Sequence, residues 1–226
     1  MRILITGSAS GLGKALAKAL LDLGHEVIPY DIDHDVRDDV TNPEGASLDE
    51  VSRLDVLVNC AGINSNEWFE DVTRESFDKI MHTNAYAIVG MTQALLPQLI
   101  ASRGTVINIV SNASHIPMTC SLAYNASKAA AAMISRQMAH ELTPKHGITV
   151  FSISPNKLAG TGMSKQIEEN VMRTRGWSAE FAAEYQRKAL MHGRETDPEA
   201  LAGFIANLID TNAMQYLSGC DIPFGK

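Results

Sequence analysis

The chain has 226 residues, 45% of them hydrophobic and 20% charged, and its formal net charge is −7. This length suits one α/β domain, so we expect residues 1–226 to form a single domain. The acidic balance argues against a nucleic-acid partner, because binding phosphates takes a concentrated basic face. The three cysteines are scattered and show no zinc-binding spacing, which predicts a reducing compartment and no metal site.

The N-terminus and the hydrophobic pattern give no sign of a membrane partner. The first strand runs almost from Met1 into a glycine turn, which leaves too little apolar sequence for a signal peptide. No apolar stretch reaches the roughly 18 to 20 residues that a bilayer-crossing helix needs. We therefore expect a soluble, cytoplasmic protein.

Short β-rich runs alternate with longer helical patterns along the chain, as in a parallel sheet wound by crossover helices. The runs predict strands at residues 3–6, 26–30, 56–59, 105–110, 148–154 and 220–222. Helical patterns occur at 14–23, 77–102 and 123–146, and Pro144 predicts that the last helix ends a turn early. Residues 34–53 are short and polar, which predicts an abbreviated crossover. The expected fold is α/β, a doubly wound parallel sheet with helices on both faces.

A glycine-rich turn at residues 6–13 (TGSASGLG) follows a predicted strand and opens a predicted helix. Gly7 permits a tight turn, Gly11 lets the backbone approach a pyrophosphate, and Gly13 lets helix and strand pack closely. The helix N-terminus offers free N–H groups and a positive dipole end to phosphates. The turn therefore predicts a dinucleotide site, and an ordinary glycine-rich turn is the alternative.

Asp31 stands at the end of the second strand, about 20 residues beyond the glycines. An acidic side chain there accepts both ribose hydroxyls of NAD and repels the 2′-phosphate of NADP. Ser10 occupies a loop position where a basic residue would meet that phosphate, and no Arg or Lys immediately follows Asp31. These features favour NAD over NADP. The alternative is that Asp31 merely ends a strand, since Asp is common in turns.

Tyr124 and Lys128 lie four residues apart near the start of a predicted helix, so they share one face. A nearby ammonium stabilises phenolate and lowers the pKa of a phenol from about 10, which prepares Tyr124 to exchange a proton with a substrate oxygen. Ser111 ends a predicted strand, where strand ends line the ligand crevice, so its hydroxyl can align the same oxygen. Alone, each feature has an ordinary explanation, a chance pair or a turn serine. Together they favour catalysis.

Taken in order, these motifs resemble those of the short-chain dehydrogenase/reductase family over nearly the whole chain. They are TGSASGLG from Thr6, NCAG from Asn59, Ser111, and YNASK from Tyr124. The TGxxxGxG pattern is that of the family's single-domain oxidoreductase branch. The resemblance implies a Rossmann fold and an enzyme that transfers a hydride between NAD(P) and a secondary alcohol or ketone.

The resemblance also implies roles for individual residues. Ser111 orients the substrate, Tyr124 is the acid/base, and Lys128 lowers the tyrosine pKa and holds the nicotinamide ribose. Asn84 matches the family's helix asparagine, whose backbone carbonyl holds a water in a proton relay to the lysine. The expected catalytic residues are therefore Asn84, Ser111, Tyr124 and Lys128.

The same resemblance implies a cofactor site built from several segments. The NCAG run at 59–62 stabilises the central sheet and passes beside the adenine ribose, and Asp39 and Val40 resemble the adenine-contacting pair. Leu158 is expected to offer backbone groups to the carboxamide, and Thr161 to contact the carboxamide or the pyrophosphate. The expected cofactor-binding residues are Gly7, Ser10, Gly11, Leu12, Gly13, Asp31, Asp39, Val40, Asn59, Ala61, Gly62, Tyr124, Lys128, Pro155, Leu158 and Thr161.

The chain departs from the family pattern in three places. Cys60 replaces the second Asn of the usual NNAG, a change expected to matter little. Asn156 follows Pro155 where the family usually has glycine, and because asparagine tolerates left-handed backbone we expect the turn to survive. Residues 220–225 (CDIPFG) replace the common VDGG ending, which is expected to alter subunit contacts or the pocket rim.

Residues 159–196 correspond to the family's substrate-covering region. Trp177, Phe181 and Tyr185 recur at four-residue intervals, so they share a helical face that meets the pocket, another subunit or the core. His115 is expected to be a surface histidine. Four basic side chains would suit an anionic substrate, but we expect them to be solvated: Lys157, Lys165, Arg173 and Arg175.

The expected partners are a small alcohol or ketone and further copies of this chain. Relatives commonly form dimers or tetramers through two long helices and the C-terminal strand. A face of small residues at Ala126, Ala129, Ala130 and Met133 would allow close helix packing, which predicts a homodimer or homotetramer. The alternative function is a catalytically silent, dinucleotide-sensing regulator on the same fold. An isomerase or dehydratase that retains NAD is disfavoured by the glycine pattern.

Overall fold

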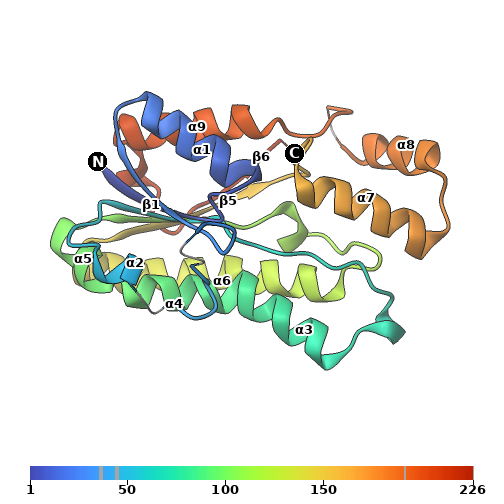
Figure 1. The fold of residues 1–226 in the computed structure, drawn as a ribbon, viewed down its shortest axis with the longest axis horizontal. Coiled ribbons are helices and arrows are strands. Elements are labelled where there is room, and N and C mark those ends of the chain that lie inside the picture. The colour runs from blue at the N-terminus through green and yellow to red at the C-terminus, as the bar shows by residue number, and fades with distance from the viewer. Residues whose placement is uncertain (36–37, 44–45, 191, 226) are drawn as a thin grey trace.

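The computed structural model describes residues 1–35, 38–43, 46–190 and 192–225. Its centre is a six-stranded sheet in the order β2-β1-β3-β4-β5-β6, with every pair of neighbours parallel (Figure 1). The predicted doubly wound α/β fold is confirmed. The strands are β1 (Arg2–Thr6), β2 (Glu26–Tyr30), β3 (Val56–Asn59), β4 (Thr105–Ile109), β5 (Thr149–Pro155) and β6 (Asp221–Phe224).

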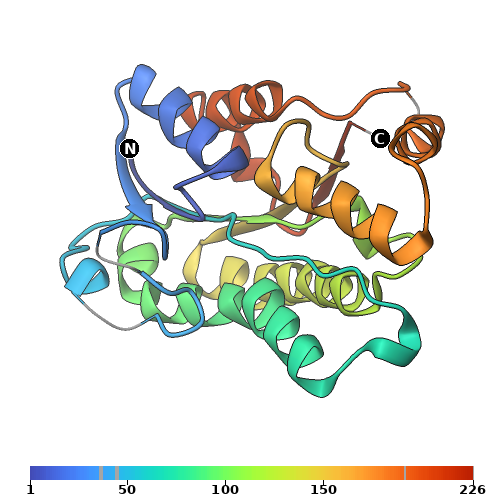
Figure 2. The same cartoon turned by 45° about the vertical axis from the view of Figure 1, so that its right-hand side comes forward.

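Helices cover both faces of the sheet, α1 and α9 on one side and α4, α5 and α6 on the other (Figures 1 and 2). Alternation along β1 explains the two layers, since Ile3 and Ile5 pack with Leu16 of α1 while Leu4 packs with Met91 of α4. The helices are α1 (Gly11–Asp22), α2 (Ala46–Asp49), α3 (Arg74–Met81), α4 (Ala87–Ala94), α5 (Leu96–Ser102), α6 (Leu122–His146), α7 (Gly162–Arg175), α8 (Ala179–Ala189) and α9 (Pro198–Asp210).

The helix expected at 77–102 is wrong as a single element. The structure divides this region into α3, a π-helical turn at His82–Tyr86, α4 and α5. Pro97 lies in the first turn of α5, and because proline has no N–H to donate it starts a new helix at an angle of 63°. In the described ranges no single helix is long and apolar enough to cross a bilayer, and only this bent pair meets the length and composition criteria.

The early end expected for the helix at 123–146 is also wrong. α6 runs to His146 with Pro144 in its last turn, and Gly147 caps it in left-handed backbone with φ 71°. The fixed φ of proline is itself helical, so near a helix end it costs a single hydrogen bond. The Gly147 N–H donates to the Thr143 carbonyl at 2.9 Å and closes the turn.

The abbreviated crossover between β2 and β3 is confirmed. Among its described residues only α2 is helical, a single turn, and Val40, Leu48 and Val51 join Tyr30 in the core. In the sheet, β1 lies between β2 and β3, and the order of the strands reverses at this point. The carboxyl ends of strands at such a point leave a crevice that binds ligands in open α/β sheets.

Candidate active site

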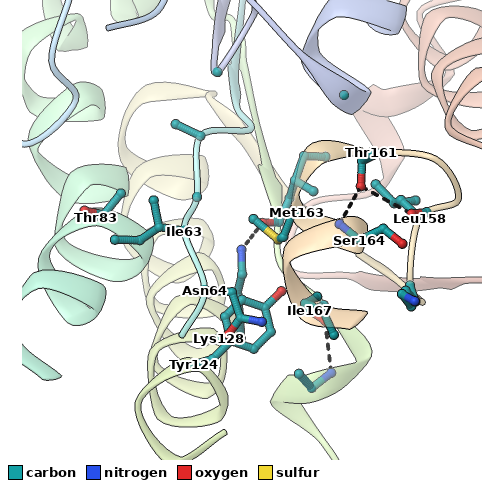
Figure 3. A pocket seen from close by; sticks show the side chains of 18 of the residues that line it. Ile63, Asn64, Thr83, Tyr124, Lys128, Leu158, Thr161, Met163, Ser164 and Ile167 are labelled. Atoms are coloured by element: carbon teal, nitrogen blue, oxygen red, sulfur yellow. Dashed lines mark hydrogen bonds between the residues drawn. The ribbon is translucent and has the colours of Figure 1, made fainter. Parts of the chain in front are cut away.

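One cavity of about 1170 Å³ opens at the carboxyl ends of the central strands. It extends from the glycine turn before α1 to α7 and α8, and Figure 3 shows part of its lining. Every expected site residue lines it except Asn59 and Asn84. The cavity thus brings together motifs that lie far apart in the chain.

At the glycine turn the backbone itself leaves no room for side chains. Gly7 has φ 69°, and a Cβ there would lie 2.8 Å from the Ala61 Cα, while a Cβ on Gly13 would lie 2.1 Å from the Gly7 carbonyl oxygen. The Thr6 hydroxyl accepts the backbone N–H groups of Cys60 and Ala61 at 3.0 and 3.1 Å. The turn after β1 and the NCAG segment after β3 are therefore locked together.

The N-terminus of α1 faces this cavity with its backbone donors open. Ser10 is the N-cap but makes no side-chain capping hydrogen bond, and a Cβ added to Gly11 would lie 3.6 Å from the Thr161 side chain. Free N–H groups at a positive dipole end fit a pyrophosphate. The residues present therefore suit the phosphates of a dinucleotide.

An acidic wall stands beside the glycine turn. The Asp31 carboxylate accepts the backbone N–H groups of Ala9 and Asp33, both at 2.9 Å, which fixes its position. Asp33, Asp38 and Asp39 line the same part of the cavity. Carboxylate oxygens have more than one lone pair, so they can still accept ribose hydroxyls, whereas a phosphate would be repelled.

Tyr124 and Lys128 project from α6 into the cavity, as predicted from their spacing (Figure 3). Both residues are more than nine-tenths buried, and the Lys128 Nζ lies 5.9 Å from the centre of the tyrosine ring. Lys128 also donates to the Ile109 carbonyl at the end of β4 at 3.0 Å. Ser111 lies two residues beyond and accepts the Ala113 N–H at 3.1 Å, which fixes its hydroxyl.

Burial is the main cause of the pKa shifts of Tyr124 and Lys128. It raises the pKa of the Tyr124 phenol, which the neighbouring Ser111 hydroxyl lowers by a smaller amount. It also lowers the pKa of Lys128 to about 8. The expected lowering of the Tyr124 pKa is therefore wrong for this structure, because the cost of burying a phenolate outweighs the stabilisation from its neighbours.

Asn84 lies in the π-helical turn and holds the loop that follows β3. Its Oδ1 accepts the Ile63 N–H at 2.8 Å, and its Nδ2 donates to the Ile63 carbonyl at 2.9 Å and to the Ser127 Oγ at 3.0 Å. π-Helical turns are frequent at functional sites. The Asn84 side chain therefore fixes one wall of the cavity without lining it.

Asn59 is the expected cofactor contact that the structure does not bring to the cavity. It is buried, and its Nδ2 donates to the Asn108 Oδ1 at 2.9 Å across the β3–β4 pair. Asn108 in turn donates to the Ser135 Oγ of α6 at 2.9 Å. This chain of amides ties the sheet to α6, so the Asn59 side chain stabilises the sheet, and its contact with a cofactor stays a prediction.

The profile described as "short chain dehydrogenase" matches residues 28–172. The chain belongs to the short-chain dehydrogenase/reductase family. It is an NAD(P)-dependent oxidoreductase of that family. It is 31% identical to the NAD-dependent glycerol dehydrogenase of Listeria innocua, over 92% of this chain and 86% of that protein. It is 28% identical to the sorbitol-6-phosphate 2-dehydrogenase of Klebsiella pneumoniae, over 96% and 91%.

The fold is similar to that of a solved structure, an NAD⁺-bound xylitol dehydrogenase. The TM-score is 0.91 at 20% sequence identity, covering 100% of this chain and 98% of that one. Among the residues described here, no group of three or more His, Cys, Asp or Glu side chains is placed to hold a metal ion.

Two departures from the family pattern contact each other in the structure. The Asn156 Nδ2 donates to the Gly225 carbonyl at 3.2 Å, and its backbone N–H donates to the Phe224 carbonyl at 3.0 Å. Its Oδ1 accepts the Lys157 N–H at 2.9 Å. Asn156 is not in left-handed backbone, so the expected use of that conformation is wrong. Asn156 instead stabilises this turn through the hydrogen bonds of its side chain.

Lys157 is not the solvated lid charge that was expected. Its side chain is 15% exposed and pairs with Glu168 of α7 at 2.8 Å and Glu195 before α9 at 2.6 Å. One ammonium therefore ties α7 and the segment before α9 to the turn after β5. Thr161 caps α7 and reaches over Gly11, so the same segment also covers the glycine turn.

The expected aromatic cluster forms, although Trp177 precedes α8 and is not part of it. The Trp177 ring lies 5.0 Å from the Phe181 ring and 4.8 Å from the Tyr185 ring, centre to centre. Trp177 and Tyr185 line the cavity, while Phe181 is half exposed. His115 is partly exposed, and its Nε2 lies 2.9 Å from the Asp221 Oδ2 of β6.

Sequence reasoning missed the cavity residues in the loops at 63–66 and 116–121. Asn64 and Asn66 follow the NCAG segment, and Thr119 precedes the YNASK motif, but no local motif marks them. Their only signal is position, because each loop continues from a strand end that already carries an expected site residue.

Proposed function

We propose that the chain transfers a hydride between NAD(H) and the carbon of a secondary alcohol or ketone. The observation that carries this proposal is the meeting of Tyr124, Lys128 and Ser111 in the wall of the cavity that also contains the glycine turn. Relatives named for the oxidation of glycerol and of sorbitol 6-phosphate support an alcohol substrate. We propose further that residues 1–226 act as one domain in which 159–196 cover the substrate.

Each proposed catalytic residue has a task that its position permits. The nicotinamide, when bound, supplies the carbon that gives or accepts the hydride. Tyr124 donates a proton to the substrate oxygen in ketone reduction and takes it back in alcohol oxidation, while Ser111 holds the same oxygen by hydrogen bonding. Lys128 stabilises the phenolate and holds the nicotinamide ribose, and Asn84 positions the loop beside them. The raised pKa of Tyr124 keeps its proton in place at neutral pH.

We propose NAD as the preferred cofactor. Its pyrophosphate fits the open N-terminus of α1, and its adenosine ribose fits the acidic wall of Asp31, Asp33, Asp38 and Asp39. Lys79 of α3 also lines the cavity, but the negative charge of the four carboxylates exceeds its single positive charge. A 2′-phosphate at this wall would meet repulsion.

The test of the proposed function compares Tyr124→Phe with wild type in NAD-linked oxidation of a panel of secondary alcohols. Loss of the phenol oxygen, which accepts the proton in oxidation, should lower kcat by about 10²–10⁴-fold, while NADH binding, followed by fluorescence, is kept. Tyr216→Phe is the matched control, since Tyr216 is 82% exposed and outside the cavity. Equal activity of Tyr124→Phe would contradict the proposal. NADH binding without turnover of any alcohol or ketone by wild type would favour the sensing regulator.

We propose that the protein is a homo-oligomer. α6 leaves Ala129 and Met133 exposed on the small-residue face, Met133 to 59%. Close approach of a second α6 would bury these side chains. Light scattering should show a dimer or tetramer that Met133→Glu weakens. A monomeric wild type would contradict the proposal.

A further inference from the structure

The end of the cavity that α7 and α8 line is called the substrate end here. Among the described residues, it contains an arginine guanidinium that no protein carboxylate pairs with. Arg175 ends α7 and lines the cavity, and it forms no ion pair within the described part of the chain. Its Nη2 donates to the Thr119 carbonyl at 2.7 Å, and its guanidinium carbon lies 4.8 Å from the centre of the Trp177 ring. Its Nε is buried and has no hydrogen-bond partner among the described residues. The group is held in place and retains donors for a ligand.

An unpartnered acceptor belongs to the same chain of hydrogen bonds. The Thr119 carbonyl that accepts from Arg175 also accepts from the Ser121 Oγ at 3.3 Å, and that Oγ accepts from the Asn66 Nδ2 at 3.3 Å. Asn66 is 5% exposed and lines the cavity, yet its Oδ1 has no hydrogen-bond partner in the part of the chain that the structure describes. Buried donors and acceptors without partners are costly, so this pair indicates a ligand that supplies both an anion and a hydroxyl.

The backbone between these residues is held in an uncommon conformation. Cys120 lies between Thr119 and Ser121 with φ 60°, in the left-handed region that non-glycine residues rarely adopt. Such backbone persists where the surrounding structure fixes it, and it clusters at ligand sites. Ser121 is also the N-cap of α6, three residues before Tyr124. The arrangement therefore lies next to the proposed acid/base.

Charge divides the cavity into two ends. In the described ranges its acidic lining residues come from the segments after β2 and from α3: Asp31, Asp33, Asp38, Asp39 and Asp78. The substrate end is lined by Lys157, which Glu168 and Glu195 already pair, and by Arg175. Of the described lining residues that α7 and its flanking turns contribute, none is acidic, so an anion bound against α7 meets the Arg175 guanidinium.

We propose that Arg175 determines substrate specificity by binding the phosphate or carboxylate of a hydroxylated substrate, with Asn66 accepting one of its hydroxyls. This inference rests on the proposed function, because it names the substrate class of the same site. Arginine presents a planar fork that matches both kinds of anion.

The test measures binding by calorimetry to the NADH-loaded Tyr124→Phe protein, so that it does not depend on turnover. The probes are sorbitol, sorbitol 6-phosphate and gluconate, which differ in the presence and kind of anion. At least one anionic probe should bind about tenfold more tightly than sorbitol. The preferred anion distinguishes a phosphate from a carboxylate substrate.

Arg175→Gln, which can still donate to Thr119, should abolish the preference for the anion, and Arg175→Lys should retain part of it. Arg173→Gln is the matched control, because Arg173 is exposed on the same helix and donates to Asn170. Unchanged NADH binding shows that each variant is folded. Equal binding of all three probes, no measurable binding of either anion, or a preference that survives Arg175→Gln would overturn the inference. If the wild type oxidised no alcohol, that result would count against the proposed function but not against anion binding by Arg175.

Discussion

The two ends of the cavity are built on different physical principles. At the glycine turn the fit is made by backbone against backbone, and Gly7 and Gly13 leave no space for a Cβ. At the substrate end the walls are held by side chains, through the ion pairs of Lys157 and the stacking of Arg175 on Trp177. Backbone contacts admit few residue types, whereas side-chain contacts can change with the substrate. The comparison explains why one end carries a family motif and the other does not.

The largest effect should come from a methyl group placed on Gly13, compared with one placed on Gly162, where the space around the position is open. Gly13→Ala puts a Cβ 2.1 Å from the Gly7 carbonyl oxygen, so we expect destabilisation by about 3 kcal/mol or more and loss of NADH binding. Gly162→Ala at the start of α7 meets nothing within 4 Å and should change the free energy of unfolding by less than about 0.5 kcal/mol. Urea unfolding of both variants and of wild type measures these changes in the free energy of unfolding. Similar losses of stability in the two variants would show that the backbone fit at Gly13 is not what sets the glycine turn apart.

The second-largest expected effect is a pH dependence of stability that comes from Lys128, which lies where the two ends of the cavity meet. Burial lowers its pKa from 10.5 to about 8. Below about pH 8 both folded and unfolded chains carry the charge, and the folded state bears the full cost of burying it. Between about pH 8 and pH 10.5 only the unfolded chain still binds the proton, so this group's contribution to stability rises by up to about 3 kcal/mol.

Lys128→Met isolates that contribution, because Tyr124 and Cys60 titrate in both proteins. The free energy of unfolding of wild type should rise relative to Lys128→Met between about pH 7.5 and pH 10, in urea unfolding without nucleotide. Parallel pH curves for the two proteins would show that the lysine is not desolvated.

A smaller effect is expected at the acidic wall. Asp31→Asn removes the charge while keeping an acceptor oxygen, so the ratio of NADP to NAD affinity should rise by about tenfold. Fluorescence titration with NADH and NADPH measures both affinities. Asp22→Asn is the control, since Asp22 is exposed at the end of α1 and pairs with Lys18. An unchanged ratio in Asp31→Asn would remove the role given to this carboxylate.

Local patterns predicted the strands and the glycine turn well because short stretches of sequence encode them. The Tyr124–Lys128 pair was found in the same way, since four residues on a helix define one face. The breaks around His82–Tyr86 and at Pro97 were missed because an apolar pattern continues through them. The hydrogen-bond partner of Asn59 could not be found in this way, because Asn108 lies on a neighbouring strand.

The sequence by itself determined the family, the order of the strands along the chain, and the motifs that line the cavity, because each depends on residues close together in the chain. Only the tertiary structure decided which charges remain unpaired. Lys157 and Arg175 are both basic residues of the substrate end, yet one meets two carboxylates and the other meets a carbonyl and an aromatic ring. Pairing depends on the distance between segments that folding brings together, and local sequence does not contain that distance.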